Sequence, residues 1–141
     1  MDEKQIDDLL RSVSIDKERI KKSIYTILSM YRIELKDVTV YRKKLNPEEI
    51  LVAAAEECNL EDAKKIMKAK YPDVLPPPVT VLEFRGKYFL FMGSNRSVVF
   101  VLKGENPDCI IVKIPDSIKE PVVISEAKQT LKEIIERQKT Y

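Results

Sequence analysis

The chain has 141 residues, 44% of them hydrophobic and 34% charged, so it can form one globular domain with its own core but not two domains of ordinary size. The formal net charge of +2 is too small to indicate a nucleic-acid partner by itself. No apolar run approaches the length of a membrane span, and the polar start at Met1–Lys4 is unlike a signal peptide. We therefore expect a cytoplasmic protein with no membrane partner.

Two residue types restrict the chemistry further. Histidine is absent, which removes the usual general base and the commonest ligand of zinc, copper and iron. A metal ion would then be held by oxygen atoms, which favours Mg²⁺ bound through carboxylates and substrate phosphates. Cys58 and Cys109 fit no metal or redox spacing, so free buried thiols are favoured over a disulfide. The many Lys and Glu residues are compatible with a thermophilic source.

The first third of the chain predicts two helices and a strand. Apolar residues recur at helical spacing over residues 3–33, and Ser14 or Asp16 is expected to cap the second helix. We treat residues 1–35 as a helical extension and residues 36–141 as the main domain. The basic outer face of the second helix is typical of a solvated surface, with contact to a phosphate backbone as the alternative. The alternating segment 38–41 predicts the first strand.

The next segment carries helix-start signals. Asn46 suits an N-cap, Pro47 suits the first helical position, and Glu49 lies where a capping-box acid reaches back. We expect this helix to end near Cys58 and a second helix to run to about Lys70, before a proline.

Residues 76–92 predict a stiff proline lead followed by a β-hairpin with its turn at 85–87. The β-branched side chains of 97–103 favour a strand. The nearly continuous apolar run 109–114 predicts a strand buried on both faces.

Residues 125–137 predict an amphipathic terminal helix. Together these elements indicate an α+β fold.

The turn after the hairpin is the strongest candidate for a binding site. The chain has three glycines, at 86, 93 and 104, and Gly93 separates a strand-like run from Ser94, Asn95 and Arg96. A glycine lets the backbone approach a ligand, and the free N–H groups at the start of a helix attract anions. Arg96 would add a planar charged fork suited to phosphate.

The order of these elements resembles the ParB N-terminal and sulfiredoxin superfamily, which includes ParB-like nuclease domains, over roughly residues 36–114. The motifs that carry the resemblance are Pro78–Val81, Tyr88–Arg96, Gly104 and Ile110–Val112. The resemblance implies a small mixed β-sheet with flanking helices, here with an N-terminal helical extension and a C-terminal helix. It also implies a helix after the glycine turn, against the strand propensity of 97–103. Gly93, Ser94, Asn95 and Arg96 would then hold the phosphates of a nucleotide.

The branches of this superfamily differ at the turn. The segment 44–52 looks most like that of the archaeal free-serine kinases, which keep a catalytic glutamate there, so Glu49 is the candidate general base. The simpler interpretation of Glu49 is a helix-capping acid. Sulfiredoxins carry a reactive cysteine and a histidine where this chain has Ser94 and Asn95, and the kinases carry an acid where it has Met92.

Two classes of function stay open. The first is a ParB/sulfiredoxin-like phosphate- or nucleotide-binding protein that acts as an ATP- or ADP-dependent phosphotransferase or a nucleotide hydrolase, with Mg²⁺ and ATP, ADP or CTP as cofactors. The second is a noncatalytic module that binds nucleic acid or regulates a partner, with the basic stretches 42–44 and 64–70 extending its surface. A purely structural interaction protein is the remaining alternative.

Overall fold

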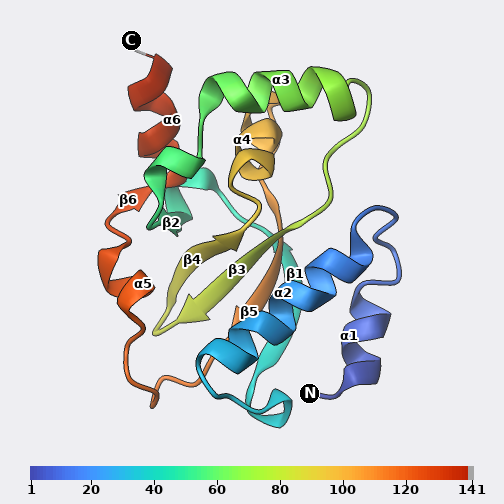
Figure 1. Ribbon diagram of the computed structural model, residues 1–141, viewed down its shortest axis with the longest axis vertical. Coiled ribbons are helices and arrows are strands. Elements are labelled where there is room, and N and C mark those ends of the chain that lie inside the picture. The colour runs from blue at the N-terminus through green and yellow to red at the C-terminus, as the bar shows by residue number, and fades with distance from the viewer. Residues whose placement is uncertain (140–141) are drawn as a thin grey trace.

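The computed structural model describes residues 1–139 and shows an α+β fold, as predicted (Figure 1). Its helices are α1 (Glu3–Leu9), α2 (Lys17–Met30), α3 (Leu60–Lys70), α4 (Ser94–Leu102), α5 (Val122–Glu126) and α6 (Leu131–Lys139). Its strands are β1 (Thr39–Lys44), β2 (Ile50–Val52), β3 (Val79–Phe84), β4 (Lys87–Met92), β5 (Asp108–Lys113) and β6 (Gln129–Thr130). None of the helices in this part of the chain is long and apolar enough to cross a membrane.

The six described strands form one mixed sheet in the order β1-β5-β3-β4-β2-β6. Strand β3 runs parallel to β5 and β2 runs parallel to β4, while the other neighbours are antiparallel. Along β5, Cys109 and Ile111 face one side, and Ile110 and Val112 face the other. All four side chains are buried, so the prediction of a strand covered on both faces is confirmed.

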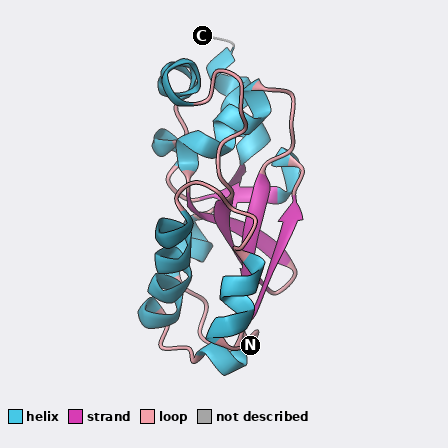
Figure 2. Cartoon of the chain, turned by 90° about the vertical axis from the view of Figure 1, so that its right-hand side faces the viewer, coloured by secondary structure: helices cyan, strands magenta, loops and turns pink. Residues whose placement is uncertain are grey.

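A helical layer covers each face of the sheet. Helices α1 and α2, with the residue that follows α1, bury Ile6, Leu10, Ile20, Ile24 and Ile27 against one face. Helices α3, α4 and α6 pack on the other, where Val98, Val99 and Phe100 of α4 are buried. In the side view of Figure 2, one group of helices lies near the N-terminus and another near the C-terminus, with strands between them. The N-terminal helices therefore contribute directly to the core.

Several local predictions are confirmed. Both N-terminal helices, the hairpin and the helix ending at Lys70 form as expected, and the Asn59 side chain caps α3 by accepting from the Asp62 N–H. The segment after Gly93 is helical, as the resemblance implied and against its strand propensity. Asp16 occupies the N-cap position of α2, but its side chain makes no capping hydrogen bond.

The prediction of a helix over residues 47–58 is wrong. A single 3₁₀ turn at Pro47–Glu49 leads into β2, and a second 3₁₀ turn follows at Ala55–Glu57. The capping box itself exists, because the Asn46 N–H donates to Glu49 Oε2 at 3.0 Å and Asn46 Oδ1 accepts from the Glu48 N–H at 3.1 Å. The chain then leaves the helical path because Ile50 and Val52 bury their side chains while β2 pairs with β4 and β6.

The terminal helix predicted over residues 125–137 is interrupted. Helix α5 ends at Glu126, and β6 pairs with β2 before α6 begins. Thr130 and Glu133 form a capping box at the start of α6, since the Glu133 N–H donates to Thr130 Oγ1 at 3.1 Å and the Thr130 N–H donates to Glu133 Oε1 at 3.2 Å. This Thr-x-x-Glu pattern is a helix-start signal that is readable in the sequence.

Both cysteines are free and buried, as predicted. Burial raises the pKa of the Cys58 thiol to about 11 and that of Cys109 to about 12. Neither thiol is therefore appreciably ionised at neutral pH.

A buried hydroxyl pair connects α2 to β3. Ser23 Oγ donates to the Ile20 carbonyl at 2.6 Å, so the Thr80 hydroxyl must donate to Ser23 Oγ, 2.7 Å away. Both side chains are almost fully buried among apolar neighbours. The Thr80 hydroxyl depends on this contact because it is fully buried, whereas Ser23 also bonds to Ile20.

We predict that Ser23→Ala lowers the free energy of unfolding by about 2 kcal/mol, because it leaves the Thr80 hydroxyl without an acceptor. Thr80→Val should cost less, about 1 kcal/mol, since Ser23 keeps its bond to Ile20. In the Ser23→Ala background, Thr80→Val should be neutral or stabilising. Urea unfolding of the two single variants and the double variant checks this prediction. A loss of stability in the double variant equal to the sum of the two single losses would contradict it.

Candidate phosphate-binding site

The turn at Gly93 requires glycine for two reasons. Its φ of +98° lies in the left-handed region, where other residues are strained. A Cβ at this position would also lie 2.7 Å from Val79 Cγ1 and 2.9 Å from Arg96 Nη2. The backbone therefore passes close to β3 and directly under the Arg96 side chain.

Helix α4 begins immediately after this turn with free backbone donors. The first N–H that bonds within the helix is that of Ser97, which donates to the Gly93 carbonyl at 2.8 Å. Gly93 has no side chain to cap the helix. The N–H groups of Ser94, Asn95 and Arg96 find no acceptor in residues 1–139. They form the positive end of a nine-residue helix, a place that favours an anion.

Arg96 brings a partly buried positive charge to this turn, and it interacts electrostatically with Tyr71 and Asp16. Its Nη1 atom is buried and has no hydrogen-bond partner within the described chain. Burial lowers the pKa of the Arg96 guanidinium from its usual value. A buried donor of this kind carries a desolvation cost that an oxygen acceptor would remove.

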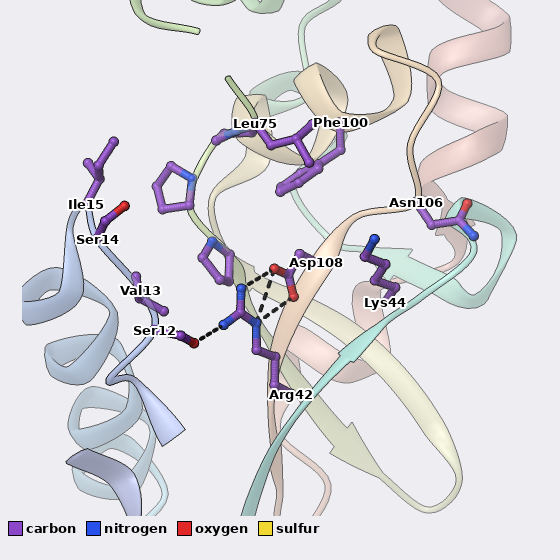
Figure 3. A pocket seen from close by; sticks show the side chains of 13 residues that line it. Ser12, Val13, Ser14, Ile15, Arg42, Lys44, Leu75, Phe100, Asn106 and Asp108 are labelled. Carbon is purple, nitrogen blue, oxygen red and sulfur yellow. Dashed lines mark hydrogen bonds and ion pairs between the residues drawn. The ribbon is translucent and has the colours of Figure 1, made fainter. Parts of the chain in front are cut away.

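Arg42, in contrast, is an arginine whose side chain is paired within the protein (Figure 3). Its Nη2 lies 2.6 Å and its Nε 3.0 Å from the Asp108 carboxylate, and Nη1 donates to Ser12 Oγ at 2.9 Å. This cluster borders a cavity of about 220 Å³ between the α1–α2 loop, the proline segment and strands β1 and β5. The hydrogen bonds within the cluster satisfy Arg42, so it offers little to a ligand.

A cavity of about 410 Å³ opens at the start of α4, in the size range of small-molecule sites. Gly93, Ser94, Asn95 and Arg96 all line it. Side chains from other elements complete its polar wall: Asp16, Arg19, Glu57, Lys70 and Tyr71. The wall thus carries three cationic side chains, two carboxylates and the free amides of a helix.

Two of the predicted ligand residues also have contacts within the fold. Asn95 Oδ1 accepts from the Asn59 N–H at 3.0 Å, which ties the start of α4 to the start of α3. The Ser94 hydroxyl donates to Glu57 Oε2 over a long distance of 3.4 Å. Asn95 therefore positions the helix terminus as much as it faces the cavity.

Glu49 lies elsewhere. It is exposed, its carboxylate accepts from the Asn46 N–H, and it does not line the cavity at Gly93. The structure brings Gly93, Ser94, Asn95 and Arg96 together and places Glu57, not Glu49, beside them. A catalytic role for Glu49 stays a prediction.

Sequence reasoning missed Asp16, Glu57 and Tyr71 and did not connect Arg19 or Lys70 to this site. The two cationic residues belong to basic stretches that are visible in the sequence. Their convergence is not visible, because α2, α3 and α4 meet only through tertiary packing.

The residues on the wall do not by themselves make a metal site. Within the part of the chain that the structure describes, no three His, Cys, Asp or Glu side chains lie close enough to hold a metal ion. A magnesium ion bound mainly by ligand phosphates needs only one or two protein carboxylates, and Asp16 and Glu57 are the two on this wall.

Comparisons with protein-family models, with curated proteins and with solved structures found no match for this chain. The superfamily resemblance stays a prediction, and a function must be inferred from the cavity itself.

We predict that Gly93→Ala lowers the free energy of unfolding by about 3 kcal/mol, because it combines left-handed strain with overlap against Val79. Gly104→Ala is the matched control. It has the same kind of backbone, with φ +76°, but open space around it, so its cost should be only about 1 kcal/mol. Urea unfolding measures the loss of stability in both variants. Equal losses would show that overlap with Val79 does not contribute to the cost of Gly93→Ala.

Proposed function

We propose that this chain binds a phosphate-bearing small molecule in the cavity at the start of α4. The observation that carries the proposal is the buried Arg96 Nη1 without an acceptor, next to three free amides. A phosphate offers several oxygen acceptors, and a charge-assisted bond to Arg96 would offset the cost of burying it. Arg19 and Lys70 add further positive charge around the same cavity.

ATP, ADP and CTP, with or without Mg²⁺, belong to this ligand class, and Asp16 would meet an ion carried by their phosphates. The geometry supports binding more strongly than catalysis. Glu49, the base expected of a phosphotransferase or hydrolase related to the ParB and sulfiredoxin superfamily, does not line the cavity. A noncatalytic phosphate-binding module is therefore the function that we favour.

A small ligand also fits better than nucleic acid. The basic stretches that would extend a nucleic-acid surface are partly neutralised, since Arg42 pairs with Asp108 and Lys64 pairs with Glu61. Of the lysines on α3, Lys70 lines the cavity. Arg19, Lys70 and Arg96 come from three different helices and converge on one cavity of small-molecule size.

Replacing Arg96 with methionine should separate binding from stability. We predict that Arg96→Met weakens binding of ATP, ADP or CTP in the presence of Mg²⁺ by about ten-fold or more. The variant should be as stable as the wild type or more so, because a partly buried guanidinium whose Nη1 donor has no acceptor among the described residues is removed. Calorimetric titration and urea unfolding of the same preparations check both effects.

Arg42→Met is the matched control. It should keep the affinity for the nucleotide and lose about 1–2 kcal/mol of stability, because it leaves the half-buried Asp108 without its partner. If wild type binds none of the nucleotides and no pyrophosphate, or if Arg96→Met binds as wild type does, the proposal is wrong.

Nucleotide turnover tests the catalytic alternative separately. We expect no turnover that depends on Glu49, so Glu49→Gln should leave any release of phosphate from ATP unchanged. Hydrolysis or transfer that this substitution abolishes would instead establish Glu49 as a base that reaches the ligand.

A further inference from the structure

A second, apolar cavity of about 180 Å³ adjoins the phosphate site. Three residues, Glu57, Phe91 and Ser94, line both cavities, so the two are contiguous. Most of the other lining residues are apolar: Met30, Val52, Ala53, Ala54, Leu82, Phe89, Leu90 and Ala127. Met30 is 56% exposed although it is a large hydrophobic residue, and it stands at this opening.

A β-bulge places Phe91 at the junction of the two cavities. Thr80 pairs with Met92 while Val81 pairs with Leu90, so Phe91 is an extra residue in β4. Phe91 and Met92 consequently both pack against the core on the α1–α2 side, although consecutive strand residues normally face opposite sides. The Phe91 ring stays half-buried and lines both cavities.

The chemistry of the wall changes in order along this cleft. One end carries Arg96, Arg19 and Lys70, which suit an anion. At the junction, the Glu57 carboxylate and the Ser94 hydroxyl would accept hydrogen bonds from ligand hydroxyls, and the carboxylate would repel a phosphate. The other end is apolar, with an aromatic ring at its mouth.

We propose that the ligand is a nucleoside phosphate, with its base in the apolar cavity against Phe91 and its ribose hydroxyls at Glu57. This assignment rests on the proposed function, because the phosphates occupy the start of α4. A planar base stacks on an aromatic ring, and a sugar carries hydroxyl donors between base and phosphate. A prenyl diphosphate has a similar charge and an apolar tail but has no hydroxyl for Glu57, so the order of groups favours the nucleotide.

The test compares ligands that share a diphosphate and differ in the rest. Pyrophosphate, ADP, CDP and geranyl diphosphate are titrated by calorimetry into the full chain. The tighter of ADP and CDP should bind about ten-fold or more tightly than pyrophosphate, because base stacking adds to the phosphate contacts. It should also bind more tightly than geranyl diphosphate.

Two variants test the assignment of the cavities. Ala54→Leu fills the apolar cavity and should remove the advantage of the nucleotide while pyrophosphate binds as before. Ala69→Leu, at an exposed position on α3 that lines neither cavity, is the matched control and should leave nucleotide affinity unchanged. Glu57→Gln should weaken the nucleotide by about three-fold or more without weakening geranyl diphosphate.

The outcomes separate this inference from the proposed function. If pyrophosphate binds and no nucleotide binds more tightly, the phosphate site stands and the nucleoside assignment is wrong. Tighter binding of geranyl diphosphate than of either nucleotide also overturns it, as does unchanged nucleotide affinity in both Ala54→Leu and Glu57→Gln. If neither pyrophosphate nor any nucleotide binds, the proposed function fails and this assignment fails with it.

Discussion

The strand β5 has no polar face, and the arrangement of the rest of the chain depends on this. Its four central side chains alternate between two cores, so the sheet must be covered on both sides. Helix α4 serves one of these cores by burying Val98, Val99 and Phe100. Once that face is buried, the first turn of α4 has to lie at the end of β4. The free amides and Arg96 are therefore presented at a fixed place by the same packing that covers the sheet.

Much of the fold could be predicted because the signals are local. Alternation and a turn identified the hairpin, a continuous apolar run identified β5, and a proline identified the end of α3. The segment after Asn46 shows the limit of such signals. Its capping box forms as predicted, yet the next residues become a strand paired on both sides, because their partners, β4 and β6, lie far away in the sequence. A local start signal specifies only one turn when a sheet competes for the residues that follow.

Only the part of the candidate site whose residues are consecutive in the sequence could be predicted. Gly93 to Arg96 are neighbours in the sequence, and their grouping needed no tertiary information. Arg19, Glu57 and Lys70 join them from other elements, and the bulge that exposes Phe91 depends on how β4 pairs with β3. Glu49 illustrates the opposite case, because its capping bond to Asn46 accounts for its position without a ligand.

The burial of Cys58 and Cys109 has a practical consequence. Since both native thiols are inaccessible and carry raised pKa values, they should remain inert toward thiol-specific dyes while the protein is folded. A cysteine introduced at the exposed Met30, at the opening of the apolar cavity, would then be the fast-reacting thiol in the native chain. The fluorescence of an environment-sensitive dye attached there would report changes inside the cleft. Neither natural cysteine would have to be removed.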